Sequence, residues 1–173
     1  YKQTHAPKFF SHFHSKWRKD KSNIELSLGE KVEQVTELDK FVEVVTDKET
    51  WQAQIVFDAR NEGSDNLKSI KKDNEVYLFQ TFLGWEVEFA GEVFDERKVT
   101  LMDFRTDQLD GINFIYVLPY SKSRALIEST SFSTRPQNCE EHSQSVRKYI
   151  AENYHGDFKI KAEESGQLPM TTR

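Results

Sequence analysis

The residues best able to do chemistry lie in one short run, Phe82-Leu83-Gly84-Trp85-Glu86. In a β-strand, alternation would put Phe82, Gly84 and Glu86 on one face and Leu83 and Trp85 on the other. A glutamate beside a glycine and an aromatic ring can lie in a cleft where burial raises its pKa, as a general acid requires. The alternation alone favours a plainer interpretation, in which Glu86 faces solvent from a half-buried sheet.

A second carboxyl group, Glu128, lies inside the apolar run Leu126–Thr130. A carboxylate in such a strand needs a partner or a shifted pKa. It is therefore a second candidate for acid chemistry, and the alternative is that Arg124 or Arg135 neutralises it.

Asp103 and Arg105 are two residues apart at the end of another β-rich run, so they share one face. They could form an ion pair that shapes the wall of a pocket. The alternative is a surface pair worth about 0–1 kcal/mol.

Metal and phosphate sites are not expected. His12 and His14 are close in sequence but lack further ligands at metal-binding spacing. The 7 glycines form neither G-x-G-x-x-G nor a P-loop, so no phosphate-binding loop is predicted within these residues. The single cysteine, Cys139, excludes an internal disulfide and fits a reducing compartment.

The composition excludes some function classes. The chain has 173 residues, 36% of them hydrophobic and 13% aromatic, which fits a globular protein of about one domain. A net charge of −5 argues against a nucleic-acid-binding protein. No apolar run approaches the ~20 residues of a membrane span, and no signal peptide is expected, because a positively charged start followed by an apolar core is not seen. A cytoplasmic location is therefore expected, with any membrane contact peripheral to the inner membrane.

Strands must position these side chains. Residues 1–23 suggest a short helix or an irregular segment. Three β-rich runs separated by polar turns form a predicted meander: 32–35, 41–45 and 52–57. Residues 61–75 are polar and predict a boundary between domains.

A second β-rich block follows this boundary. Its predicted strands cover 76–89 (with a kink at Gly84), 99–104, 112–118, 125–130 and 158–162. Asn138 and Glu141 have the spacing of a capping box, which predicts a helix over about 140–154. The expected class is α+β, with a mostly antiparallel sheet and a helix.

Five segments, taken in chain order, resemble motifs of the lycopene cyclase family: Phe79–Glu86 (F-x-G-x-E), Leu101–Arg105 (M-D-W-R), Phe114–Pro119 (F-x-Y-x-[LM]-P), Leu126–Thr130 (L-[IL]-E-[ED]-T) and Glu163–Met170 (E-E-x-G-x-[IL]-P). Phe57-Asp58-Ala59-Arg60 resembles the family's D-A-R-G, with Asn61 in place of its glycine. Ser129 stands where the family usually carries a second acid.

This resemblance implies an internal fragment of a flavoprotein, interrupted at both ends and inactive in isolation. Residues 1–60 would be the meander of an incomplete Rossmann-like FAD-binding domain, and 61–173 a substrate-binding sheet domain incomplete at its C-terminus. Family members use reduced FAD, with NAD(P)H as reductant, to cyclise the ends of lycopene without net redox change. An acid protonates the terminal double bond, a neighbouring double bond attacks the cation, and proton loss leaves an ionone ring, here expected to be β.

The resemblance also implies roles for particular residues. Glu86 matches the functional glutamate of the family and is the first candidate for proton transfer or cation stabilisation, with Glu128 second. Aromatic faces stabilise a carbocation, and four residues are expected to bind substrate: Phe79, Phe82, Trp85 and Tyr116. Asp103 and Arg105 are expected to shape the site.

Two other functions remain open. A related flavoprotein hydroxylase or prenyl reductase would carry the same sheet over a different substrate and would show redox turnover. An inactive module that binds apolar ligands would retain a carotenoid without converting it. The oligomeric state, and whether one or both ends of the substrate are cyclised, do not follow from the sequence.

Overall fold

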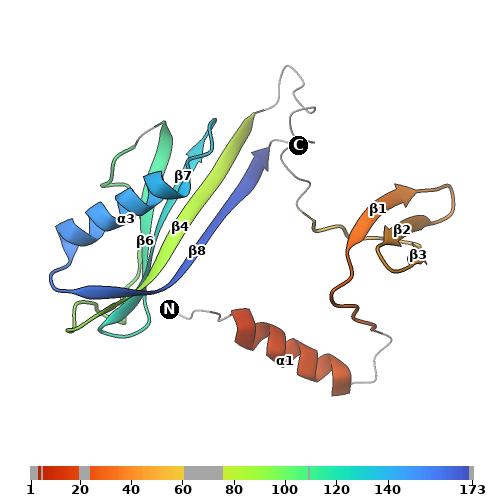
Figure 1. Ribbon diagram of the computed structural model, residues 1–173, viewed down its shortest axis with the longest axis horizontal. Helices are drawn as coiled ribbons and strands as arrows, with labels where there is room; N and C mark the ends of the chain where they lie inside the picture. The colour runs from red at the N-terminus through yellow and green to blue at the C-terminus, as the bar shows by residue number, and fades with distance from the viewer. Residues whose placement is uncertain (1–3, 5, 20–23, 61–75, 109, 172–173) are drawn as a thin grey trace. The chain divides into compact units, whose positions relative to one another are not determined.

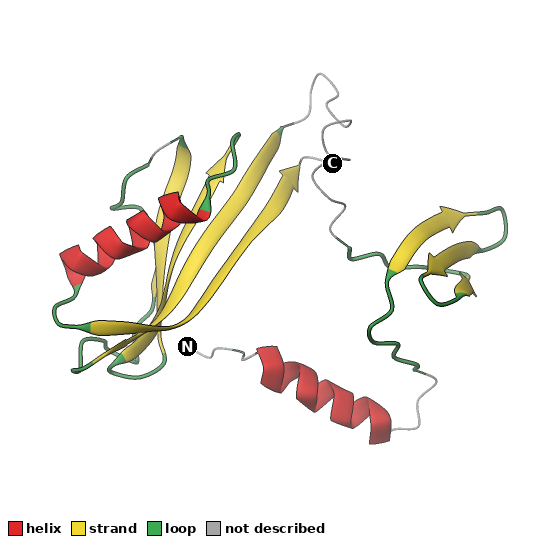
Figure 2. Ribbon diagram, viewed as in Figure 1, coloured by secondary structure: helices red, strands yellow, loops and turns green. Residues whose placement is uncertain are grey.

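The fold is α+β, with two antiparallel sheets and two helices in the part of the chain that the structure describes (Figures 1 and 2). The computed structural model describes residues 4, 6–19, 24–60, 76–108 and 110–171. The described residues form two compact units, one within 2–70 and the other within 71–173. The predicted boundary over 61–75 lies outside the described residues.

The first unit contains helix α1 (Ala6–Lys19) and a three-stranded sheet. Strands β1 (Val32–Glu37), β2 (Val42–Thr46) and β3 (Thr50–Ala53) pair in chain order, as the meander predicts. The prediction that the third strand covers 52–57 is wrong in its bounds. Ala53 pairs with Val42, the first residue of β2, so the chain beyond Ala53 has no part of β2 left to pair with.

The second unit is built on a five-stranded antiparallel sheet with the order β5-β6-β7-β4-β8. Its strands are β4 (Tyr77–Phe89), β5 (Thr100–Asp103), β6 (Gly111–Pro119), β7 (Arg124–Ser133) and β8 (Phe158–Thr171). In Figure 1, β4 and β8 lie side by side along their whole length. β8 is therefore much longer than the predicted 158–162, because β4 offers it thirteen residues to pair with.

Helix α3 (Cys139–Asn153) covers one side of this sheet. The capping box predicted from the sequence is present: the Asn138 side chain accepts from the Glu141 backbone N–H, and the Glu141 side chain accepts from the Asn138 N–H. The helix buries Val146, Tyr149 and Ile150 against the apolar side chains of the sheet. Neither described helix is both long and apolar enough to cross a membrane.

The pairing register defines two faces of the sheet. The helix face is the side covered by α3 and includes Leu83, Trp85, Val87 and Phe89 of β4, all at most 3% exposed. The distal face is the opposite side. Its residues on β4, β6, β7 and β8 include Phe82, Gly84, Glu86, Phe114, Tyr116, Leu126, Glu128, Thr130, Ala162, Glu164 and Gly166.

The expected kink at Gly84 is absent, because Gly84 pairs in unbroken register with Glu128 on β7 and Glu164 on β8. The irregularity lies further along. Glu86 pairs with Ala162 and Val87 with Ile160, so Lys161 is an extra residue in β8 and forms a β-bulge.

Candidate active site

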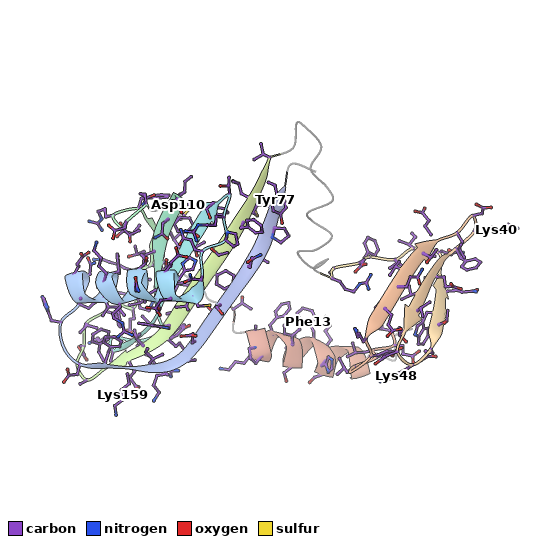
Figure 3. All side chains as sticks on the ribbon, turned by 45° about the horizontal axis from the view of Figure 1, so that its top comes forward. Phe13, Lys40, Lys48, Tyr77, Asp110 and Lys159 are labelled. Atoms are coloured by element: carbon purple, nitrogen blue, oxygen red, sulfur yellow. The ribbon has the colours of Figure 1, made fainter. Side chains whose placement is uncertain are left out.

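The alternation of β4 is the one expected from the sequence, and it places odd-numbered and even-numbered residues on opposite faces. In Figure 3, Tyr77 lies at the start of β4, and Lys159 marks the opposite end of the β4–β8 pair. The even-numbered residues from Phe82 to Glu88 belong to the distal face, and none of them is part of the buried apolar cluster under α3. The two carboxyl groups of this strand, Glu86 and Glu88, therefore lie on the distal face.

Glu128 lies at the centre of the distal face. Across the sheet it is flanked by Tyr116 on β6 and Gly84 on β4, and beyond Gly84 lies Glu164 on β8. The Thr130 hydroxyl donates a hydrogen bond of 2.8 Å to Glu128 Oε1. A half-buried carboxyl group bounded by an aromatic side chain is suited to holding a proton.

Burial raises the pKa of Glu128 above its ordinary value. The hydrogen bond from Thr130 lowers the pKa in part, and the negative charge of Glu164 raises it again. The sequence left open whether an arginine neutralises Glu128. Arg124 instead pairs with Glu86, and Arg135 pairs with Asp110 and Glu141.

Glu86 is on the same face, one row away, but in a different electrostatic setting. The Arg124 guanidinium donates to its Oε2 at 2.8 Å, and Glu86 is the main cause of a raised pKa of Arg124. Arg124 lies opposite Glu88 on the neighbouring strand and reaches diagonally to Glu86. The negative charge of Glu86 is therefore partly compensated.

Gly84 makes room for the Glu128 side chain. A Cβ atom at position 84 would lie 2.9 Å from Leu126 Cδ1 and 3.3 Å from Glu128 Cβ. A small pocket of about 130 Å³ opens beside this glycine. Its lining residues are Gly84, Glu86, Tyr120, Leu126, Ala162, Glu163 and Glu164.

The four predicted aromatic residues do not gather in one place. Phe82 and Tyr116 lie on the distal face, in rows next to each other. Trp85 lies on the helix face at 3% exposure, with its indole N–H donating to Glu163 at 2.8 Å and the Arg147 guanidinium 5.0 Å from its ring centre. The structure therefore does not bring Trp85 or Phe79 together with Phe82, because both are odd-numbered residues of β4.

Phe114 takes a place beside Glu128 that sequence reasoning missed. It pairs with Thr130, is 1% exposed, and packs edge-to-face on Tyr116 with ring centres 5.2 Å apart. Phe132 is a further neighbour of Phe114 on the same face, at 5.9 Å. The sequence feature that could have identified Phe114 is the alternation in the run Phe114–Pro119, which puts Phe114 on the same face as Tyr116. Its position next to Glu128 also requires the register of β6 on β7.

Asp103 and Arg105 do form the expected ion pair, at 2.7 Å. Asp103 pairs with Ile115 and so belongs to the helix face, where the Tyr149 hydroxyl donates to it at 2.9 Å. Arg105 holds the pKa of Asp103 well below its usual range, and burial raises the pKa of Tyr149. The pair ties β5 to α3 and does not face Glu128.

A buried polar cluster that was not predicted from the sequence lies between α3 and the sheet. His142, 1% exposed, contacts the Ser129 hydroxyl through Nδ1 at 2.9 Å and the Thr81 hydroxyl through Nε2 at 3.0 Å. Ser129 also donates to Asn113, and Thr81 bonds to Ser131. Burial lowers the pKa of His142 to about 4, so its ring is neutral at neutral pH. Because these groups are buried, the Ser129–His142 contact is structural.

The described residues do not fit the diphosphate of a dinucleotide. Gly29 and Gly156, the two described glycines with positive φ, precede strands rather than helices. The first turn of helix α3 carries Glu140 and Glu141, and Asn138 and Glu141 form its capping box, so its N-terminus does not attract an anion. Among the described residues, no three His, Cys, Asp or Glu side chains gather to hold a metal.

The whole chain, residues 1–173, matches the family described as lycopene cyclase protein. A lycopene beta-cyclase from Paracoccus sp. (strain N81106 / MBIC 01143) is 42% identical over 55 residues, which are 32% of this chain and 14% of that protein. The match therefore spans about a seventh of the relative.

Two solved structures are similar at low sequence identity. A crystal structure of halogenase PltM in complex with ethyl mercury and mercury matches 81% of this chain and 32% of its own, with 17% identity and a TM-score of 0.47. The structure of tetracycline destructase Tet(51) matches 83% of this chain and 41% of its own, with 12% identity and a TM-score of 0.38. At these TM-scores they support no inference about function.

Proposed function

Since this chain belongs to the lycopene cyclase family, we propose that its second unit supplies the surface on which the end of a linear carotenoid is protonated and closed into a ring. The substrate is lycopene or a related linear carotenoid. A β ring is the proposed product, supported by the identity to a lycopene beta-cyclase. The reaction is an isomerisation, because one proton is added and one is lost.

The observation that carries the proposal is the position of Glu128 on the distal face. Its pKa is raised, chiefly by burial, and Phe82, Phe114 and Tyr116 occupy its own and the next row of the sheet. A protonated carboxyl group can deliver a proton to the terminal double bond, and the aromatic faces then stabilise the cation that forms. Sequence reasoning placed Glu86 before Glu128 as the acid; the geometry favours Glu128.

Glu86 has the complementary role in this proposal. Held in its ion pair with Arg124, it supplies negative charge one row from Glu128. Negative charge fixed near a developing cation lowers the energy of the transition state. We therefore assign Glu86 to cation stabilisation rather than to the first proton transfer.

Reduced FAD and NAD(P)H, which the family resemblance implies, remain part of the proposal without assigned residues. The part of the chain that the structure describes does not fit the diphosphate, so every step above is assigned to side chains of this chain. Redox turnover, with oxygen or with a reduced double bond, would point to the hydroxylase or reductase alternative.

Peripheral contact with a membrane, from a cytoplasmic location, is also proposed, because a linear carotenoid is confined to apolar phases. Strand β5 and its surroundings expose several apolar side chains, Leu101 (64%), Met102 (43%), Phe104 (49%) and Ile112 (53%). Co-sedimentation of the full-length protein with anionic vesicles measures the contact. Binding that is unchanged after Leu101→Ser and Phe104→Ser would place the contact elsewhere.

The test of the proposal replaces each carboxyl group in the full-length protein, expressed in lycopene-accumulating cells whose pigments are separated by chromatography. Glu128→Gln should reduce ring formation by at least about 100-fold, since it removes the acid. Glu86→Gln should cause a smaller loss. Glu88→Gln is the matched control, because Glu88 lies on the same strand and face as Glu86 and its side chain is 43% exposed in an ion pair with Lys161. Ring formation that survives in Glu128→Gln would overturn the assignment.

A further inference from the structure

Gly166 on β8 lies directly beneath the ring of Phe82. The two residues are paired across β4 and β8, and a Cβ atom at position 166 would lie 2.6 Å from Cζ and 2.7 Å from Cε1 of Phe82. Real Cβ atoms essentially never approach other heavy atoms this closely. The Phe82 ring can occupy its place only because residue 166 has no side chain.

The ring position affects the neighbouring strand on its other side. Phe82 pairs with Thr130 on β7 and with Gly166 on β8, and its ring end lies over β8. The ring is therefore turned away from Thr130, whose hydroxyl donates to Glu128. In the next row, Gly84 also has no side chain. No side chain of β4 therefore stands between β8 and Glu128 in that row.

We propose that Gly166 is a positioning residue that keeps the approach to Glu128 open to the end of a linear polyene, by letting the Phe82 ring lie over β8. This inference rests on the proposed function. The aromatic ring then forms one side of the approach and presents its face to the reacting end of the substrate. Gly166 lies on β8, which is separated from Glu128 by β4. It therefore affects access to Glu128 only through the position of the Phe82 ring.

The backbone supports this assignment. Gly166 does not have a positive φ, and β8 is paired in register on both sides of it, so an alanine fits the strand conformation. The strain of Gly166→Ala therefore falls on the Phe82 ring. Because χ1 of phenylalanine has three staggered positions, a ring that leaves β8 must rise from the sheet or turn toward Thr130. Either movement narrows the approach to Glu128.

The experiment is a double-mutant cycle in the full-length protein with lycopene in detergent micelles. Gly166→Ala should raise KM by about tenfold or more, with a smaller change in kcat, because access is lost while the acid remains. Adding Gly166→Ala to Phe82→Leu should change KM by less than about twofold, because the smaller side chain leaves room for the methyl group. Gly91→Ala is the matched control, since nothing lies within 4 Å of a Cβ atom there.

The outcomes separate the inference from the function it rests on. If the wild-type protein converts lycopene and Gly166→Ala has the same KM as wild type, the inference is overturned but the proposed function is not. The same holds if Gly166→Ala raises KM as much in the Phe82→Leu background as in wild type. Wild-type protein that neither binds nor converts lycopene overturns both. If Gly166→Ala does not fold, the double variant decides: folding and conversion support the steric contact with Phe82, and failure to fold shows that the methyl group clashes elsewhere and overturns the inference.

Discussion

The polar side chains on the helix face of the second sheet are buried and bonded to one another, whereas the carboxyl groups on the distal face are at least partly exposed. Ser129 and Glu128 are neighbours in the chain, yet Ser129 is fully buried between His142 and Asn113, and Glu128 has Thr130 as its hydrogen-bond partner. A buried cluster whose members satisfy one another stabilises a fold. A carboxyl group that is not held within such a cluster, and that lies beside aromatic rings, remains able to react. One face therefore serves stability and the other is free for chemistry.

The largest expected effect lies on the helix face. His142→Ala should lower the free energy of unfolding by about 2–4 kcal/mol, because it leaves a cavity and deprives Ser129 and Thr81 of a partner. Urea unfolding of the full-length protein measures this, with Gln144→Ala, exposed on the same helix, as control. Ring formation per folded molecule should be unchanged. A loss of specific activity without a loss of stability would break the division between the faces.

The same histidine predicts a pH dependence. Its pKa of about 4 in the folded protein is below the ordinary value of 6.5, so the folded state binds fewer protons between these values. Stability due to His142 is therefore present at neutral pH and is lost as the pH falls from about 6.5 to 4. Unfolding measured across this range should show a smaller loss in His142→Gln than in wild type.

A smaller loss of stability is expected for Asp103→Asn, about 1–2 kcal/mol at pH 7, because Tyr149 and Arg105 then face an uncharged amide. The pKa of Asp103 is lowered in the folded protein, so its contribution is present above the ordinary pKa of a carboxyl group and disappears as the pH falls. The difference between variant and wild type should therefore shrink in acid. An equal difference at pH 7 and pH 3 would contradict the ion-pair explanation.

On the distal face, Glu128→Gln should change stability in the opposite direction at high pH. A raised pKa means that wild-type stability falls as the pH rises through the pKa of folded Glu128, and the glutamine variant lacks this loss. The stability of the variant relative to wild type should rise between pH 4 and pH 8. This rise should be smaller than the loss of stability caused by Asp103→Asn. Thermal unfolding at the two pH values tests the sign.

The smallest effect concerns Glu164, whose charge contributes to the raised pKa of Glu128. Glu164→Gln should move the alkaline limb of the activity profile to lower pH, because Glu128 then loses its proton more easily. Glu163→Gln, its neighbour with a different partner, Trp85, should leave the limb in place. A shift in both variants would point to a general effect of charge on β8.

The sequence predicted the parts of the fold that local rules control. The capping box of α3 and the alternation of β4 depend on residues close in the chain, and both are present. The partner of Arg124 and the end of β3 depend on how strands align across the sheet, which spacing along one strand cannot reveal. For the same reason, the sequence could not predict which of Glu86 and Glu128 forms an ion pair. That depends on which carboxyl group an arginine of another strand can reach.

The β-bulge at Lys161 has a consequence for how this region can change in length. If the strands paired regularly here with Lys161 retained, Lys161 would lie opposite Val87 and point toward the core. Phe158 would then move to the other face and leave the aromatic group of Phe89, where the ring centres are 5.3 Å apart. With the bulge, the segments on either side keep their faces independently. Insertion or deletion of a single residue at this point can therefore be absorbed without turning Gly166 or Glu164 to the wrong side, so sequence distance from α3 is a poor guide to position on the distal face.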